Sequence, residues 1–154
     1  IYTLSLHDAL PIFGAMMATF VLMDRDSRKV HGVEPEIVAP YQSEFDKKLI
    51  RGPKYANLED PISKDYHVRF YDLDMNGHVN NSKYLDWIFE VMGADFLTNY
   101  IPKKINLKYV KEVRSGGMIA SAYELKGLES KHQIISDGEI NAQAMITWQE
   151  IKKD

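Results

Sequence analysis

Residues 81–99 hold the feature that most restricts how this chain can fold. Asn80 or Asn81 can cap a helix there, because an asparagine side chain accepts a hydrogen bond from a free backbone N–H. Pro102 stops any continuation, so we expect the helix to end at about Asn99. Its apolar positions, which cover more than one stripe, are Tyr84, Leu85, Trp87, Ile88, Phe89, Val91, Met92, Ala94, Phe96 and Leu97. Such a helix is expected to be buried on several sides.

Strand-like runs lie on both sides of this helix. Before it, Tyr66, Val68 and Phe70 alternate with polar residues, which is strand spacing. After it, four runs are separated by turn signals at 115–117, at 129–130 and at 137–138. The runs cover residues 103–114, 118–128, 132–136 and 139–151. We therefore expect an α+β fold in which a curved antiparallel sheet wraps a central helix.

Composition excludes several kinds of chemistry. The 154 residues suit one domain, or one domain and a fragment of another. The chain has no cysteine, which excludes disulfides, thiolate metal ligands and a thiolate nucleophile. A net charge of −3 does not point to nucleic acid. The low-charge run at 10–23 is too short to span a bilayer, and no Lys or Arg precedes it as in a signal peptide, so we expect a cytoplasmic protein.

Three polar side chains at alternating positions precede the predicted helix. Asp74 and His78 are candidate general acids or bases, and Asn76 is a candidate hydrogen-bond donor. The helix N-terminus beyond them offers free N–H groups and a dipole that suits a developing oxyanion. The alternative is a polar turn with helix caps, since Asp, Asn and Gly are the residues of which turns are made.

The sequence D-L-D-M-N-G-H-V-N-N-S-K-Y at 72–84 resembles the signature of acyl-acyl-carrier-protein thioesterases, and Trp87 and Glu90 continue the likeness. These enzymes end fatty-acid synthesis and normally carry two hotdog domains in tandem. The family also places a glutamate in a Tyr-x-x-Glu context, which residues 109–112 supply here. A cysteine often follows that glutamate, whereas this chain has Val113, so no cysteine can act at that position.

The resemblance implies a hotdog fold and catalysis by Asp74, Asn76, His78 and Glu112. In our chemical interpretation, Glu112 or Asp74 deprotonates a water, while Asn76 and a helix N–H polarise the thioester carbonyl. His78 then assists proton transfer to sulfur. Strict alternation along 103–114 conflicts with this role, because it puts Glu112 on a solvent-facing side of the strand. A bulge or strong twist is needed to turn it inward.

The sequence pattern and the resemblance together divide the chain into segments. Residues 2–12 match the translation of a common short-read sequencing adapter, so we interpret 1–12 as a non-native artefact. Residues 13–40 are expected to be the last strands of a first hotdog domain, with a buried strand at 13–23 and a returning strand at 28–33. Proline-rich residues 41–61 are expected to be a linker, and 62–154 a complete second, catalytic hotdog.

The resemblance implies an acyl carrier protein as the partner, and it implies no cofactor and no metal. Self-association of the chain is a further option. A weak candidate surface for the acidic carrier is basic: Lys103, Lys104, Lys108, Lys111 and Arg114. The alternative is a solvated strand face. Two other functions remain open, a hotdog acyl-CoA thioesterase that relies on Asp74, and an inactive acyl-binding fragment. A dehydratase of the same fold needs a His/Asp or His/Glu motif of its own, which the chain does not show.

Overall fold

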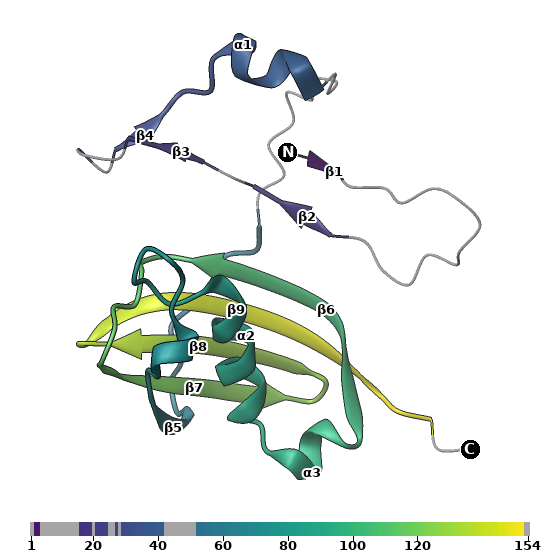
Figure 1. Ribbon diagram of the computed structural model, residues 1–154. Coiled ribbons are helices and arrows are strands. Elements are labelled where there is room, and N and C mark those ends of the chain that lie inside the picture. Colours follow the sequence, from purple (N-terminus) through teal and green to yellow (C-terminus); the bar gives the residue numbers. More distant parts are fainter. Residues whose placement is uncertain are drawn as a thin grey trace. The chain divides into compact units, whose positions relative to one another are not determined.

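The computed structural model describes residues 2–3, 16–19, 21–24, 27, 29–41 and 52–152. The chain divides into two compact units between residues 51 and 52, a point inside the predicted linker 41–61 (Figure 1). The elements of the first unit are β1 (Tyr2–Thr3), β2 (Met17–Ala18), β3 (Leu22–Met23), β4 (Val30–His31), α1 (Pro35–Val38) and the 3-10 turn η1 (Ala39–Tyr41). The assignment of 13–40 to a first hotdog domain stays a prediction.

Two short antiparallel pairs make up the strands of the first unit. β1 pairs with β2, and β3 pairs with β4 around a turn in which the N–H of Asp24 donates to the carbonyl of Lys29. A hairpin at this place was expected and is present, but the predicted burial of the strand at 13–23 was wrong for its described residues. Val21 is 60% exposed and Leu22 43% exposed. A two-stranded hairpin has no second layer of its own that could bury them.

The second unit is a five-stranded antiparallel sheet with two helices. Its strands lie in the order β5-β7-β8-β9-β6, so β5 and β6 form the edges. The elements are β5 (Ile62–His67), the 3-10 turn η2 (Phe70–Asp72), α2 (Asn81–Glu90), α3 (Ala94–Leu97), β6 (Tyr100–Tyr109), β7 (Met118–Lys126), β8 (Glu129–Ser136) and β9 (Glu139–Glu150). The expected α+β class is confirmed, with α2 lying across the concave side of the curved sheet (Figure 1).

The predicted helix is shorter than expected. Asn80 caps α2 by accepting from the N–H of Ser82 at 3.0 Å, as the sequence suggested, but α2 ends at Glu90. Gly93 has a φ of 82°, which no helix can contain, and it separates α2 from the short α3. The expectation of one helix to Asn99 was therefore wrong.

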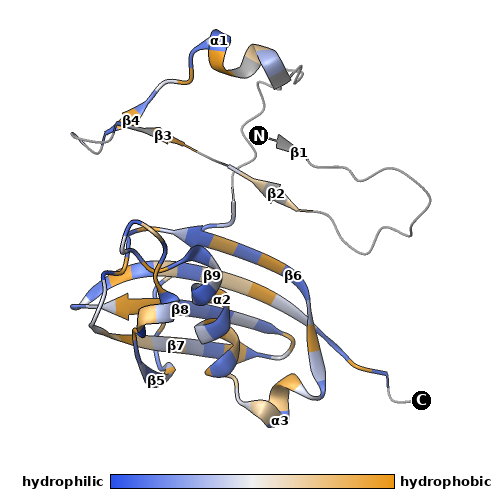
Figure 2. Cartoon of the chain, in the orientation of Figure 1, coloured by the Kyte–Doolittle hydropathy of each residue, from blue (hydrophilic) through white to orange (hydrophobic). Residues whose placement is uncertain are grey.

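The core of the second unit lies between α2 and the sheet. Trp87 and Ile88 of α2 are buried, and the hydroxyl of Ser121 on β7 donates to the carbonyl of Trp87 at 2.9 Å. Ser82, Asp86 and Glu90 form one exposed stripe, so the helix is buried on its other sides only. From β9, the predicted alternation brings Ala142, Ala144, Ile146 and Trp148 into the core. Figure 2 shows this alternation as changing colours along β6 and β9.

Several strand boundaries differ from the sequence prediction, and β6 covers Tyr100–Tyr109 where 103–114 was expected. The turn expected at 129–130 lies at 127–128 instead, where Gly127 has a φ of 61°, and Glu129 already pairs with Lys126. Phe70 was expected to alternate inward, yet it starts the turn η2 and is 80% exposed. The hairpin at Asp137 and Gly138 is confirmed, since both residues have positive φ as a type I′ turn requires.

Candidate active site

Asp74 and His78 face each other across a tight hairpin loop. Leu73 pairs with Val79, the N–H of Asp74 donates to the carbonyl of His78 at 2.7 Å, and the N–H of Gly77 donates back to the carbonyl of Asp74 at 3.1 Å. Gly77 has a φ of 74°, which completes a three-residue loop of the kind that ends in a left-handed residue. The motif therefore folds locally into a turn that brings Asp74, Asn76 and His78 together.

The carboxylate of Asp74 stabilises this loop from inside. Its Oδ1 accepts from the N–H of Asn76 at 2.8 Å and from the N–H of His78 at 3.1 Å. The N–H of His78, followed by the N–H and the side chain of Asn76, holds the pKa of Asp74 below its usual range. Asp74 is therefore ionised at neutral pH and a weak base, because hydrogen bonds to the charged form disfavour taking up a proton.

An ion pair between the buried Asp72 and the exposed Arg69 precedes the loop. The carboxylate of Asp72 is fully buried and accepts from the backbone N–H of Arg69 at 2.8 Å and from its guanidinium at 3.0 Å and 3.2 Å. Burial raises the pKa of Asp72, but these bonds and the charge of Arg69 outweigh burial and leave the pKa below its usual value. The carbonyl of Asp72 also accepts from the N–H of Asn80 at 2.8 Å, which joins the loop to the start of α2.

His78 meets Glu112, which lies 34 residues further along the chain. The imidazole Nε2 is 3.5 Å from the carboxylate Oε2, and the two side chains are 33% and 49% exposed. Backbone pairing between His78 and Arg114 sets the two segments side by side. The structure thus brings three of the four predicted residues onto one loop and places the fourth, Glu112, in contact with His78.

The reason that Glu112 reaches the loop is a bulge at the end of β6. The carbonyl of Asn141 on β9 accepts from the N–H of Val110 at 2.7 Å and from the N–H of Lys111 at 3.1 Å. Two residues of one strand thus face one residue of the other, which is how a bulge bends a strand. Because β6 ends at Tyr109, the alternation that placed Glu112 toward solvent does not extend to it.

The helix N-terminus offers fewer free donors than the sequence suggested. Asn80 accepts from the N–H of Ser82 through its side chain and from the N–H of Lys83 at 2.9 Å through its carbonyl. Two of the first N–H groups of α2 are therefore already engaged. The side-chain amide of Asn76 is the better candidate for polarising a carbonyl. It has two N–H donors, and its hydrogen bond to Asp74 uses only one of them.

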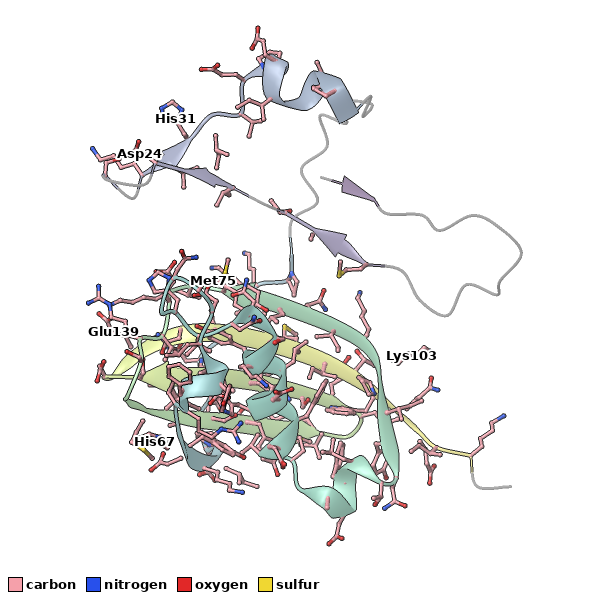
Figure 3. The ribbon with its side chains drawn as sticks, in the orientation of Figure 1. Asp24, His31, His67, Met75, Lys103 and Glu139 are labelled. Atoms are coloured by element: carbon pink, nitrogen blue, oxygen red, sulfur yellow. The ribbon has the colours of Figure 1, made fainter. Side chains whose placement is uncertain are left out.

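The five basic residues do not gather in one place. Lys103, Lys104 and Lys108 follow the edge strand β6, and Lys103 lies toward the opposite end of that strand from Met75 on the loop (Figure 3). Lys111 forms an ion pair with Glu139. Arg114 pairs with His78 of the loop, and Lys108 is the one of the three β6 lysines that lies nearest the end of that strand at Tyr109.

The sequence analysis did not assign two buried residues that contact the segment around Glu112 to the site. Tyr84 accepts from the N–H of Val113 at 3.1 Å, and Asn141 contacts the carbonyl of Glu112 at 3.5 Å. Tyr84 stands at the end of the motif that carried the family resemblance, which was the available signal. Nothing marks Asn141 before the register of β6 and β9 is known.

A metal site finds no support within the described ranges, where no three His, Asp or Glu side chains gather as a metal ion would need. None of the helices in the described part of the chain is long and apolar enough to cross a membrane.

The helix wrapped by a curved sheet, with acidic and imidazole groups on the loop before the helix, defines a hotdog-fold protein of the thioesterase kind. Residues 55–150 match the model of the acyl-ACP thioesterase C-terminal domain, and the chain belongs to this family. The motif resemblance and the expected hotdog fold are thereby confirmed.

Two relatives and two solved structures illustrate the family. The chain is 28% identical over 142 residues to oleoyl-acyl carrier protein thioesterase 2 of Arabidopsis thaliana, and 33% identical over 106 residues to the acyl-[acyl-carrier-protein] hydrolase FATB2 of Cuphea viscosissima. These matches cover 81% and 62% of this chain. A structure of a proposed oleoyl thioesterase from Lactobacillus plantarum superposes with a TM-score of 0.76 at 32% identity over 85% of this chain. The 12:0-ACP thioesterase of Umbellularia californica shares the fold, with a TM-score of 0.72 at 20% identity over 84% of this chain.

The chain spans only part of each of these proteins. It covers 36% of the Arabidopsis enzyme and 25% of the Cuphea enzyme. It covers 55% and 53% of the Lactobacillus and Umbellularia structures. The matched region includes the loop with Asp74 and the segment with Glu112.

Proposed function

We propose that this chain hydrolyses the thioester of a fatty acyl-acyl carrier protein and releases a free fatty acid, the step that terminates fatty-acid synthesis. The observation that carries the proposal is the contact of His78 with Glu112 beside the Asp74 turn, in a chain of the acyl-ACP thioesterase family. The relatives are named for hydrolysis of oleoyl-, palmitoyl- and dodecanoyl-acyl carrier protein.

In the proposed reaction, Glu112 is the general base. Its carboxylate takes a proton from water as the water oxygen attacks the thioester carbonyl carbon. Asp74 is a poorer base because its pKa is lowered and its Oδ1 already accepts two N–H bonds. Its role is to hold the loop and to place a negative charge beside His78.

The remaining steps use Asn76 and His78. The Asn76 amide donates to the carbonyl oxygen as negative charge develops on it in the tetrahedral intermediate. The carbon–sulfur bond then breaks, and the proton that Glu112 took from water passes through His78, which is in contact with Glu112, to the leaving sulfur. The products are the fatty acid and the free thiol of the carrier's phosphopantetheine.

The test is hydrolysis by the full chain of oleoyl-, palmitoyl- and dodecanoyl-acyl carrier protein, with the matching acyl-CoA esters as controls. We expect a higher kcat/KM for the carrier substrates. Added salt should raise KM for the carrier substrates but not for a small uncharged thioester if Lys108 and Arg114 bind the acidic carrier, since salt screens exposed charges. An equal salt response for the small thioester removes the carrier surface from the proposal, and the absence of any hydrolysis removes the function.

The rival function, an acyl-CoA thioesterase in which Asp74 does most of the work, makes the opposite prediction for two variants. We expect Glu112→Ala to lose most activity. If Glu112→Ala keeps wild-type activity while Asp74→Asn has none, the result favours the rival function.

Two further expectations belong to the proposal. The cytoplasm remains the expected compartment, although the plant relatives are named as chloroplastic. Self-association through an edge of the sheet, at β5 or β6, also stays a proposal. Light scattering would test it, because the measured mass in solution would exceed that of one chain.

A further inference from the structure

Val113, the residue next to Glu112, is held at both of its backbone polar groups. Its N–H donates to the hydroxyl of Tyr84 at 3.1 Å, and its carbonyl accepts from the N–H of Val79 at 3.1 Å. The Val113 side chain is 2% exposed and belongs to the core. Because Glu112 precedes this fixed point directly, the path of its backbone depends on the two bonds.

Tyr84 is well placed to act as a rigid support. It lies on the first turn of α2, is 2% exposed, and packs edge-on against Trp87 and Tyr109 with ring centroids 5.8 Å and 5.2 Å apart. Burial raises the pKa of the Tyr84 hydroxyl, so the hydroxyl is neutral when its oxygen accepts from Val113.

Asn141 holds the other side of Glu112. Its Nδ2 lies 3.5 Å from the carbonyl of Glu112, and its Oδ1 accepts from the hydroxyl of Ser136 at 2.8 Å. The backbone carbonyl of Asn141 fixes the bulge before Glu112, and the residue is 1% exposed. Glu112 itself is exposed and lies between these two buried supports.

We propose that Tyr84 and Asn141 are positioning residues, which hold the segment around Glu112 so that its carboxylate stays in contact with His78. The inference rests on the proposed function, because it assigns Glu112 as the base. Neither residue is a catalytic residue, since both act on the backbone beside Glu112 and not on the reacting atoms.

The test compares Tyr84→Phe with a matched control in the full chain, using oleoyl-acyl carrier protein as substrate. Tyr84→Phe removes only the hydroxyl that binds Val113. Tyr109→Phe also removes a hydroxyl that bonds to backbone, the carbonyl of Asn81 at 2.9 Å, but leaves Val113 alone. We expect kcat to fall roughly ten- to a hundredfold in Tyr84→Phe, because small misplacements of a reacting group are costly. KM should be unchanged, and Tyr109→Phe should keep wild-type kcat.

Asn141→Ala provides the second variant and is expected to lower kcat in the same way. Two readouts separate positioning from a general structural role. In a Glu112→Gln background, Tyr84→Phe should cause no further loss, because residues that act through one group are not additive. Hydrogen exchange of the Val113 amide should accelerate in Tyr84→Phe but not in Tyr109→Phe.

The outcomes are distinct. If the Val113 amide of Tyr84→Phe loses its protection from hydrogen exchange while kcat stays at the wild-type value, the role of Tyr84 is overturned. A wild-type kcat in folded Asn141→Ala overturns the role of Asn141. A further loss of activity in the Glu112→Gln background shows that Tyr84 does not act through Glu112 and also overturns the proposal. If the wild-type chain hydrolyses no thioester, the proposed function fails, and the positioning roles fail with it.

Discussion

His132 makes the stability of the second unit sensitive to mild acid. The side chain lies on β8, is 1% exposed, and its Nε2 is 2.7 Å from the hydroxyl of Ser130, which in turn accepts from the indole of Trp148 at 2.7 Å. Its Nδ1 is buried without a hydrogen-bond partner among the described residues. A proton added to this ring would bring a buried charge and an unsatisfied N–H.

The size of the effect follows from linkage between protonation and folding. The ordinary pKa of 6.5 applies to the unfolded chain, and burial lowers the pKa of His132 to about 4 in the folded protein. Between these values the unfolded state binds a proton that the folded state does not, so stability falls as pH falls. The expected loss is about 2 kcal/mol between pH 7.5 and 5.0, and roughly 3 kcal/mol below pH 4.

Urea unfolding at pH 7.5 and 5.0 measures this loss. The fluorescence of Trp87 and Trp148 is a suitable signal, because both lie in the core of the second unit. His132→Gln removes the titrating group and should remove about 2 kcal/mol of the pH dependence. His67→Gln makes the same chemical change at an exposed position and should behave as wild type. An equal loss in wild type and His132→Gln would refute the reasoning.

Three other substitutions have defined outcomes. Val113→Cys adds the only thiol of the chain, and Ellman's reagent should label it in urea but not in the folded protein, because the side chain is 2% exposed; rapid labelling of the folded protein would contradict the burial. Gly77→Ala should cost about 1–2 kcal/mol of unfolding free energy and lower kcat, because a residue with a Cβ is strained at the φ of 74°, even though no neighbouring atom would lie within 4 Å of that Cβ. Gly117→Ala is the control, since Gly117 has no positive φ, and it should cost less. Arg69→Ala should lower the urea midpoint of unfolding at neutral pH, and the loss should shrink as the pH falls through and below 3.8, where Asp72 becomes protonated in the unfolded chain. A loss independent of pH would contradict the ion pair.

Local signals in the sequence predicted the parts of the fold that depend on neighbouring residues. Asn80 was recognised as a cap and Asp137 and Gly138 as a hairpin turn, because each depends only on its own side chain or backbone freedom. The alternation along β9 was correct because one face of this strand packs on the helix. The three residues of the loop followed from the motif.

The features that were missed depend on contacts between distant segments. A bulge or strong twist before Glu112 was expected, but no local pattern marks the residue that makes it, Asn141, which is 29 residues away from Glu112. The break of the helix at Gly93 was overlooked because apolar residues continue beyond it, although glycine is the residue that can adopt its φ of 82°. Phe70 keeps strand alternation in sequence but begins η2, where the ion pair of Arg69 with Asp72 decides the backbone.

The most direct test of the account is whether His78 and Glu112 act as one unit. The measurement is the release of free fatty acid from oleoyl-acyl carrier protein by the wild-type chain, His78→Gln, Glu112→Gln and the double variant. We predict that each single variant lowers kcat roughly 10²- to 10⁴-fold and that the double variant is no worse than the poorer single one. Near-wild-type activity in either single variant, or multiplied losses in the double variant, would contradict the account.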